Sequence, residues 1–271
     1  MNKENFELYN YLNVVGNPKE VIDKILEEIP YLESIGYAGY KEKKWLKITL
    51  DRLIPDKKED NQNYNFKENY KKEIKTISEK TFRKCQDYIK EKTHIFLFPT
   101  FDKFTIEKMK GVSGYCPWNN TLLIFINFNN GWKDQLEETI IHELAHSLSP
   151  YAKFDAPIGS WIILEGIAEQ FKDFIIKGKK SLWVTTISKK ESFEILKDIK
   201  ELLNKNDFEN YKEIFYGSGK YPLWAGYAIG YNLIEIYLEN TPNLNWNKLL
   251  RENPQKIIKE TTSPQTLAKN L

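Results

Sequence analysis

Apolar and polar positions recur along the chain with two different periods, which separate helical regions from a short region of strands. Before residue 90, apolar residues recur at helical spacing in segments that start at Pro18, Lys44 and Tyr70. The charged, asparagine-rich stretch 56–67 is typical of a surface loop. We therefore expect an N-terminal helical region in residues 1–90 and a second region in 91–271.

Two short apolar runs interrupt the helical period. Residues 94–99 and 121–128 are rich in β-branched and aromatic side chains, which favours buried strands. The stretch 111–120 between them carries turn formers and indicates a loop. The helical period then resumes and includes a dense apolar segment that starts at Leu223. The pattern predicts an α+β fold that is mainly helical and has a small mixed sheet.

One predicted helix carries the sequence His142-Glu143-Leu144-Ala145-His146, and its apolar positions give it a buried side. His142 and His146 are four residues apart, so a helix places them one turn apart on the same face. Two imidazoles in this arrangement can bind one cation, and Glu143 can act on a water beside it. These two histidines are two of only three in the chain.

A third candidate ligand, Glu165, follows His146 after 18 intervening residues. A catalytic zinc ion takes three protein ligands and leaves one position open, and two histidines with one glutamate form a recurring set. The pattern therefore predicts Zn²⁺ bound by His142, His146 and Glu165. The alternative is an ordinary amphipathic helix with a coincidental motif, and metal content distinguishes the two.

The predicted helix around Glu165 has recognisable limits. Ser160 is a candidate N-cap and Gly178 a candidate C-terminal stop. Gly166 lacks a side chain, so we expect this helix to approach the histidine-bearing helix closely there. The final stretch, 243–271, is polar and is expected to pack loosely.

Charge and composition narrow the function classes. Forty basic and 38 acidic residues give a net charge of +2 over 271 residues, which provides no global field for nucleic acid or an anionic membrane. The N-terminus lacks an apolar segment of signal-peptide length, and no run of 18 apolar residues occurs. We expect a cytoplasmic protein with no nucleic-acid or membrane partner. Buried free thiols are favoured for Cys85 and Cys116, with a disulfide as the alternative.

The spacing His142-Glu143-x-x-His146, 18 residues, then Glu165-Gly166-Ile167-Ala168-Glu169 resembles the gluzincin metallopeptidases. The later run 224–231, with the sequence WAGYAIGY, more narrowly resembles the DUF2268 (YjaZ-like) family of predicted zinc-dependent proteases. The similarity covers about residues 90–240. It implies a zincin-like metallopeptidase domain in 91–271 with a C-terminal helical subdomain, a zinc cofactor and a peptide or protein substrate.

The resemblance also implies roles for two further features. In gluzincins the strand before the histidine-bearing helix lies along the cleft, so the predicted strand 121–128 is expected to be the edge strand that pairs with an extended substrate. Thermolysin-like gluzincins place an acidic residue where Glu169 stands, and there it accepts a hydrogen bond from a metal-bound imidazole and so orients the ring. The alternative for Glu169 is simple exposure to solvent. The Gly-x-Met-Glu-Asn signature of one aminopeptidase family is absent, which favours cleavage within a peptide.

A zinc peptidase needs a base and an oxyanion donor besides the metal. Glu143 is the candidate general base. Tyr227 and Tyr231 lie one helical turn apart and are candidate hydroxyl donors, with a core position as the alternative for each. His94 is expected to be a strand-end histidine with a hydrogen-bond partner, with a role as metal ligand as the alternative. The alternative function is a non-catalytic zinc-binding regulatory or peptide-binding protein.

Overall fold

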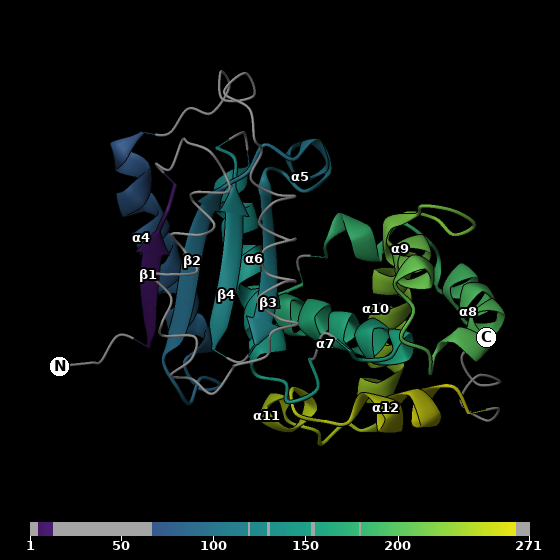
Figure 1. Cartoon of the computed structure of the whole chain (residues 1–271). Helices are drawn as coiled ribbons and strands as arrows, with labels where there is room; N and C mark the ends of the chain where they lie inside the picture. The colour runs from purple at the N-terminus through teal and green to yellow at the C-terminus, as the bar shows by residue number, and fades with distance from the viewer. Residues whose placement is uncertain are drawn as a thin grey trace. The chain divides into compact units, whose positions relative to one another are not determined.

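The computed structural model describes residues 5–12, 67–118, 120–128, 131–152, 155–178 and 180–263. The chain forms two compact units, Met1–Glu143 and Leu144–Leu271. The first contains a small sheet and the second is built from helices (Figure 1). The predicted α+β class, mainly helical with a small mixed sheet, is confirmed. The helices expected to start at Pro18 and Lys44 lie outside the described residues.

Four strands form the sheet of the first unit, in the order β1-β2-β4-β3. β1 (Phe6–Asn10), β2 (Thr93–Pro99) and β4 (Thr121–Ile126) are parallel, and β3 (Val112–Trp118) runs antiparallel to β4. Every residue of β2 and β4 is buried, which explains their continuous apolar sequences. The strands predicted in 94–99 and 121–128 are confirmed.

The edge strand beside β4 is β3, and this corrects two expectations. The stretch 111–120 was expected to be a loop, and the strand in 121–128 was expected to be the edge strand. β4 instead lies between β2 and β3. β3 contains Gly114 and Pro117, and its pairing with β4 shifts register between Tyr115 and Trp118. Edge strands and bulges tolerate glycine and proline, so turn-forming residues do not exclude a strand here.

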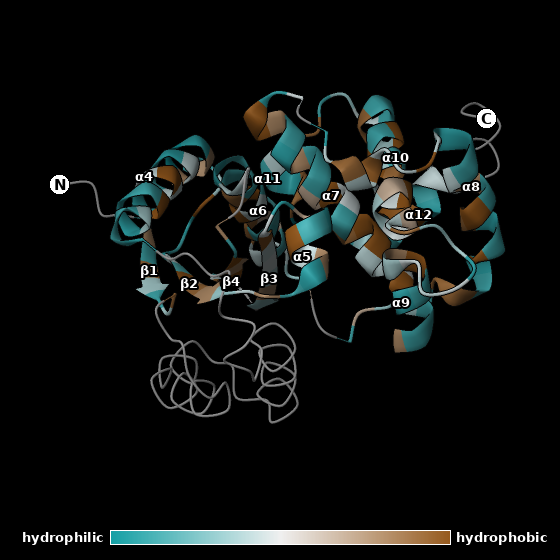
Figure 2. Cartoon of the chain, turned by 90° about the horizontal axis from the view of Figure 1, so that it is seen from above, coloured by the Kyte–Doolittle hydropathy of each residue, from teal (hydrophilic) through white to brown (hydrophobic). Residues whose placement is uncertain are grey.

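Helices α4 (Glu68–Cys85) and α6 (Trp132–Ser147) contribute to the core on one face of this sheet. Ile74 and Phe82 of α4 and Leu136 and Ile140 of α6 are buried with apolar residues of all four strands. Figure 2 colours α4 mostly teal with brown patches, as an amphipathic helix requires. A short helix, α5 (Lys103–Lys108), connects β2 to β3 and is capped by Asp102.

The expectation of helices alone in residues 1–90 is wrong at β1. Its five residues pair with β2 from Phe6 to Asn10, and the ring of Phe6 lies 4.6 Å from the ring of Phe82. β1 and α4 thus belong to the same core as β2 and β4. The two compact units divide after Glu143, and the expected domains 1–90 and 91–271 stay a prediction.

Two long helices form the centre of the second unit. α7 (Ile158–Ile176) and α10 (Ala225–Asn240) are buried along most of their length. They cross at Gly166 and Gly230, where a Cβ atom on Gly166 would overlap the carbonyl group of Gly230. The sequence predicted that the histidine-bearing helix packs closely against Gly166. The helix that packs against Gly166 is instead α10. The absence of both side chains lets the two backbones touch.

The ends of α7 differ partly from the prediction. Its N-cap is Pro157, and Ser160 lies inside the first turn, where its hydroxyl accepts a hydrogen bond from Gln255. Ser160 is therefore not the N-cap. The helix ends in a left-handed residue, Lys177, and the N–H of Gly178 donates to the carbonyl of Asp173. Gly178 thus marks the C-terminal stop as predicted.

Shorter elements complete the second unit: η2 (Leu182–Val184), α8 (Lys189–Asp198), η3 (Lys200–Leu202), α9 (Phe208–Tyr216), α11 (Trp246–Leu249) and α12 (Pro254–Thr261). Loose packing was expected after residue 243, but Leu249, Leu250 and Ile257 are fully buried. Among the helices of the described ranges, none has the length and apolar character needed to cross a bilayer.

The crossing of α7 and α10 generates a prediction for stability. Replacing Gly230 by alanine places a methyl group against the backbone of α7 at Ile162 and Gly166. We expect Gly230→Ala to lower the free energy of unfolding by about 1–3 kcal/mol, the usual cost of overpacking, as measured by urea denaturation. Glu239→Ala, at an exposed position of the same helix, is the control. Equal midpoints for the two variants would contradict the close crossing.

Candidate metal centre

His142 and His146 lie on one face of helix α6. The apolar side of the helix is fully buried at Leu136, Ile140, Ile141 and Leu144. Burial of this side fixes the rotation of the helix about its axis. His142 is half-buried and His146 is buried, so the two imidazoles lie one turn apart near the limit of the core.

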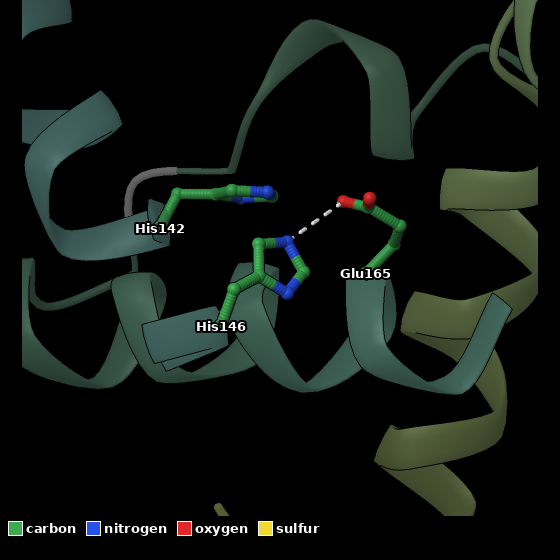
Figure 3. Close-up of side chains that lie close together, drawn as sticks. All are labelled: His142, His146 and Glu165. Carbon is green, nitrogen blue, oxygen red and sulfur yellow. Dashed lines mark ion pairs between the residues drawn. The ribbon is translucent and has the colours of Figure 1, made fainter. Parts of the chain in front are cut away.

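Glu165 joins the two histidines from α7. Its side chain is 6% exposed, and one of its carboxylate oxygens lies 3.4 Å from Nε2 of His146. The ligand atoms of His142, His146 and Glu165 all lie within 4.8 Å of one another. Figure 3 shows the two rings and the carboxylate turned toward one common point.

The geometry of these three side chains fits zinc. Ligand atoms at ordinary zinc distances in a tetrahedral arrangement lie about 3.4 Å apart, as Nε2 of His146 and the oxygen of Glu165 do. A set of two imidazole nitrogens and one carboxylate oxygen leaves a fourth position for water or substrate. A buried carboxylate that faces two imidazoles also needs a positive charge to compensate its own. The three side chains can therefore hold a zinc ion.

Glu143 lies beside the edge strand β3. Its side chain is 7% exposed, and it occupies the space that a side chain at position 114 would fill. A Cβ atom on Gly114 would lie 2.7 Å from Oε1 of Glu143 and 2.7 Å from Cγ2 of Thr139. The missing side chain of Gly114 thus allows the carboxylate of Glu143 to lie directly against the backbone of β3.

A buried polar cluster follows Glu165 on α7. Lys172 is fully buried, and its ammonium group donates to Oε2 of Glu169 over 2.8 Å and to the hydroxyl of Ser181. It also lies 3.3 Å from Oδ1 of Asp173. Glu169 is fully buried as well, so simple exposure to solvent is excluded. Its contact with a ligand imidazole stays a prediction.

The two candidate tyrosines differ in their surroundings. The hydroxyl of Tyr231 donates to Oδ2 of Asp173 over 2.8 Å, and burial together with this bond raises its pKa. A hydroxyl that is already bonded to a buried carboxylate is a poor candidate donor for an oxyanion. Tyr227 is half-buried, and its ring meets the ring of Phe215 edge-on at 5.5 Å. Tyr227 is therefore the better candidate of the two.

Other reactive side chains of the described ranges are placed elsewhere in the fold. His94 lies in β2, where its Nδ1 is 3.2 Å from the hydroxyl of Tyr9, in agreement with the expected hydrogen-bond partner. Cys85 and Cys116 are buried, and neither is part of a disulfide, as favoured from the sequence. Burial raises the pKa of the Cys85 thiol to about 12, so it stays protonated and is a poor nucleophile.

Comparison with known families agrees with this geometry. The model of the family described as Predicted Zn-dependent protease (DUF2268) matches residues 74–259. The chain belongs to this family. Searches of curated proteins and of solved structures find no significant match. The matched residues of the DUF2268 family include α6 and α7 together with all three candidate ligands.

Sequence reasoning missed two residues near the centre. Gly114 was interpreted as a turn former, although a glycine close in sequence to an apolar run also indicates close backbone approach. Lys172 was not singled out, because one lysine in a chain of 40 basic residues carries no local signal. Its position three residues after Glu169 was the available hint, since this spacing places the two charges on one helix face.

The grouping of His142, His146 and Glu165 predicts the metal content of the purified protein. Wild-type protein should contain one equivalent of zinc, and His146→Ala should lose it because two ligands hold the ion too weakly. Atomic absorption after dialysis measures both values. His94→Asn, which removes the remaining histidine, should keep one equivalent. Loss of zinc from that variant, or its retention in His146→Ala, would contradict the assigned ligands.

Proposed function

We propose that this chain is a zinc-dependent peptidase that hydrolyses peptide bonds with an activated water. The convergence of His142, His146 and Glu165 is the observation that carries the proposal. The family description, a predicted zinc-dependent protease, supports it. Zinc in such a site lowers the pKa of its water toward neutrality and polarises a substrate carbonyl.

Glu143 is the proposed general base. It follows His142 directly on α6, so it lies at nearly the same height along the helix axis as this candidate ligand. It takes a proton from the attacking water and passes it to the nitrogen of the leaving amine. A site retained only for zinc binding has no need of this carboxylate, which favours the peptidase over the non-catalytic alternative.

The edge strand β3 is the proposed docking strand for the substrate backbone. Among the strands that the structure describes, β3 pairs with β4 alone, so its other edge has backbone N–H and C=O groups to offer. An extended peptide added there would run past Gly114 and thus past Glu143. The sequence led us to expect this role for the strand in 121–128. Because β3, and not that strand, lies at the edge of the sheet, we assign the role to β3. An added strand of this kind suits cleavage within a peptide.

Tyr227 is the proposed hydroxyl donor to the oxyanion that develops when water attacks the carbonyl. Its half-buried position leaves part of the side chain accessible. Tyr231 shares its helix, but its hydroxyl is held by Asp173. Tyr227→Phe should accordingly affect hydrolysis more than Tyr231→Phe.

Replacement of the base tests the function directly. Glu143→Gln keeps the shape of the side chain and removes its capacity to accept a proton. We expect it to retain one equivalent of zinc and to lose hydrolysis of a mixed peptide library, measured by mass spectrometry with and without a chelator. Substantial chelator-sensitive cleavage by this variant would refute the assigned base. Absence of cleavage by the zinc-loaded wild-type protein would favour the non-catalytic alternative.

Gly114→Ala tests the position of that base. The new methyl group must displace the side chain of Glu143, and a misplacement of 1 Å can cost about 10²-fold in rate. We expect kcat to fall by about one to two orders of magnitude while the zinc content is unchanged.

The matched control is Ser113→Ala, on the same strand with its side chain on the opposite face. It should keep the wild-type rate. Wild-type kcat in Gly114→Ala would show that the contact between Gly114 and Glu143 has no catalytic consequence.

A further inference from the structure

A continuous series of aromatic rings begins at a candidate zinc ligand within the second unit. The ring of Trp161, on α7, meets the ring of His146 edge-on at 6.3 Å. Tyr211, on α9, meets Trp161 in the same manner at 6.4 Å. Trp161 and Tyr211 are both half-buried, so neither ring is enclosed in the core. Apolar surface therefore starts directly beside the candidate metal centre.

The series branches at Tyr211. On the buried side, Phe215 stacks on Tyr211 at 4.4 Å and contacts Tyr227 in turn. On the accessible side lie the rings of Phe208, 57% exposed, and Tyr216, 39% exposed. We refer to Trp161, Phe208, Tyr211 and Tyr216 as the aromatic arc. It leads from a zinc ligand to the surface, and its buried branch ends at the proposed oxyanion donor.

The outer members of the arc, Phe208 and Tyr216, are exposed. An exposed aromatic ring gains little from folding, whereas contiguous exposed apolar surface marks sites that bind a partner or ligand. Lys212 lies 5.2 Å above the ring of Phe208, but it is paired with Glu209 over 2.7 Å. The two charges compensate, so the rim favours an apolar ligand over a charged one.

We propose that the aromatic arc is a specificity subsite, which binds a large apolar side chain of the substrate close to the scissile bond. This inference rests on the proposed peptidase function and names the substrate class, peptides with an aromatic or long aliphatic residue near the cleaved bond. Trp161 and Tyr211 present ring surface to that side chain, and Phe208 and Tyr216 cover its outer part. The preference is modest in size, since contact with an apolar subsite discriminates by about 10–200-fold.

The test uses blocked hexapeptides in which one position at a time carries alanine, leucine or phenylalanine. At one position, wild-type protein should cleave the phenylalanine or leucine peptide with a kcat/KM about tenfold or more above that of the alanine peptide. Phe208→Ala and Tyr211→Ala should reduce this ratio severalfold, because they remove ring surface that contacts the large apolar side chain. Because Phe208 is exposed, its variant carries the test even if Tyr211→Ala fails to fold.

Leu182→Ala is the matched control, because Leu182 is 60% exposed and lies outside the arc. It should keep the wild-type ratio. An undiminished ratio in Phe208→Ala and Tyr211→Ala, or the absence of an apolar preference at every position, would overturn the subsite.

Binding to Glu143→Gln separates this inference from the function on which it rests. Calorimetry with the phenylalanine and alanine peptides should show tighter binding of the former, and Phe208→Ala in the same background should reduce the difference. If no peptide is cleaved but this difference appears, the peptidase proposal fails and the subsite stands. If cleavage occurs without a binding difference, the subsite fails and the peptidase stands.

Discussion

The structure depends on one constraint: three candidate ligand atoms from separate turns of helix must reach the same small volume. The helical period supplies two of them, because residues four apart on α6 project from one face. The third belongs to Glu165 on α7. It reaches the other two only if α7 keeps a fixed position along its axis and a fixed rotation about it. Nε2 of His146 and the carboxylate of Glu165 stand 3.4 Å apart, a separation that one turn of sliding along α7 would destroy.

Glycines meet much of this requirement. Gly166 follows Glu165 directly, and its contact with Gly230 fixes α7 against α10 at the residue next to the ligand. Within the first unit, Gly114 leaves space for the carboxylate of Glu143 beside β3. In both places a missing side chain determines where a candidate functional side chain lies. Asp173, about two turns farther along α7, adds a second contact with α10, because its carboxylate accepts a hydrogen bond from the hydroxyl of Tyr231.

The local patterns of the sequence were sufficient to predict the parts of the site that lie on regular helices. The spacing of His142 and His146 depends on helical periodicity and ligand chemistry, which are both local, whereas Glu165 was identified by the 18-residue spacing that resembles the gluzincins. The edge strand was missed because Gly114 and Pro117 are turn formers in most contexts, and only pairing with β4 makes them part of a strand. The partner of Gly166 was assigned to the wrong helix, since one glycine indicates close approach without indicating what approaches. Long-range packing decides such questions, and a single sequence records it only indirectly.

X-ray absorption at the zinc edge tests the central claim most directly, since it reports the atoms around the metal in the folded protein. The account predicts a shell of nitrogen and oxygen at about 2.0–2.1 Å with the outer-shell scattering of two imidazole rings. Sulfur at about 2.3 Å would assign the metal to a cysteine and contradict the account. A shell without imidazole scattering would contradict it equally.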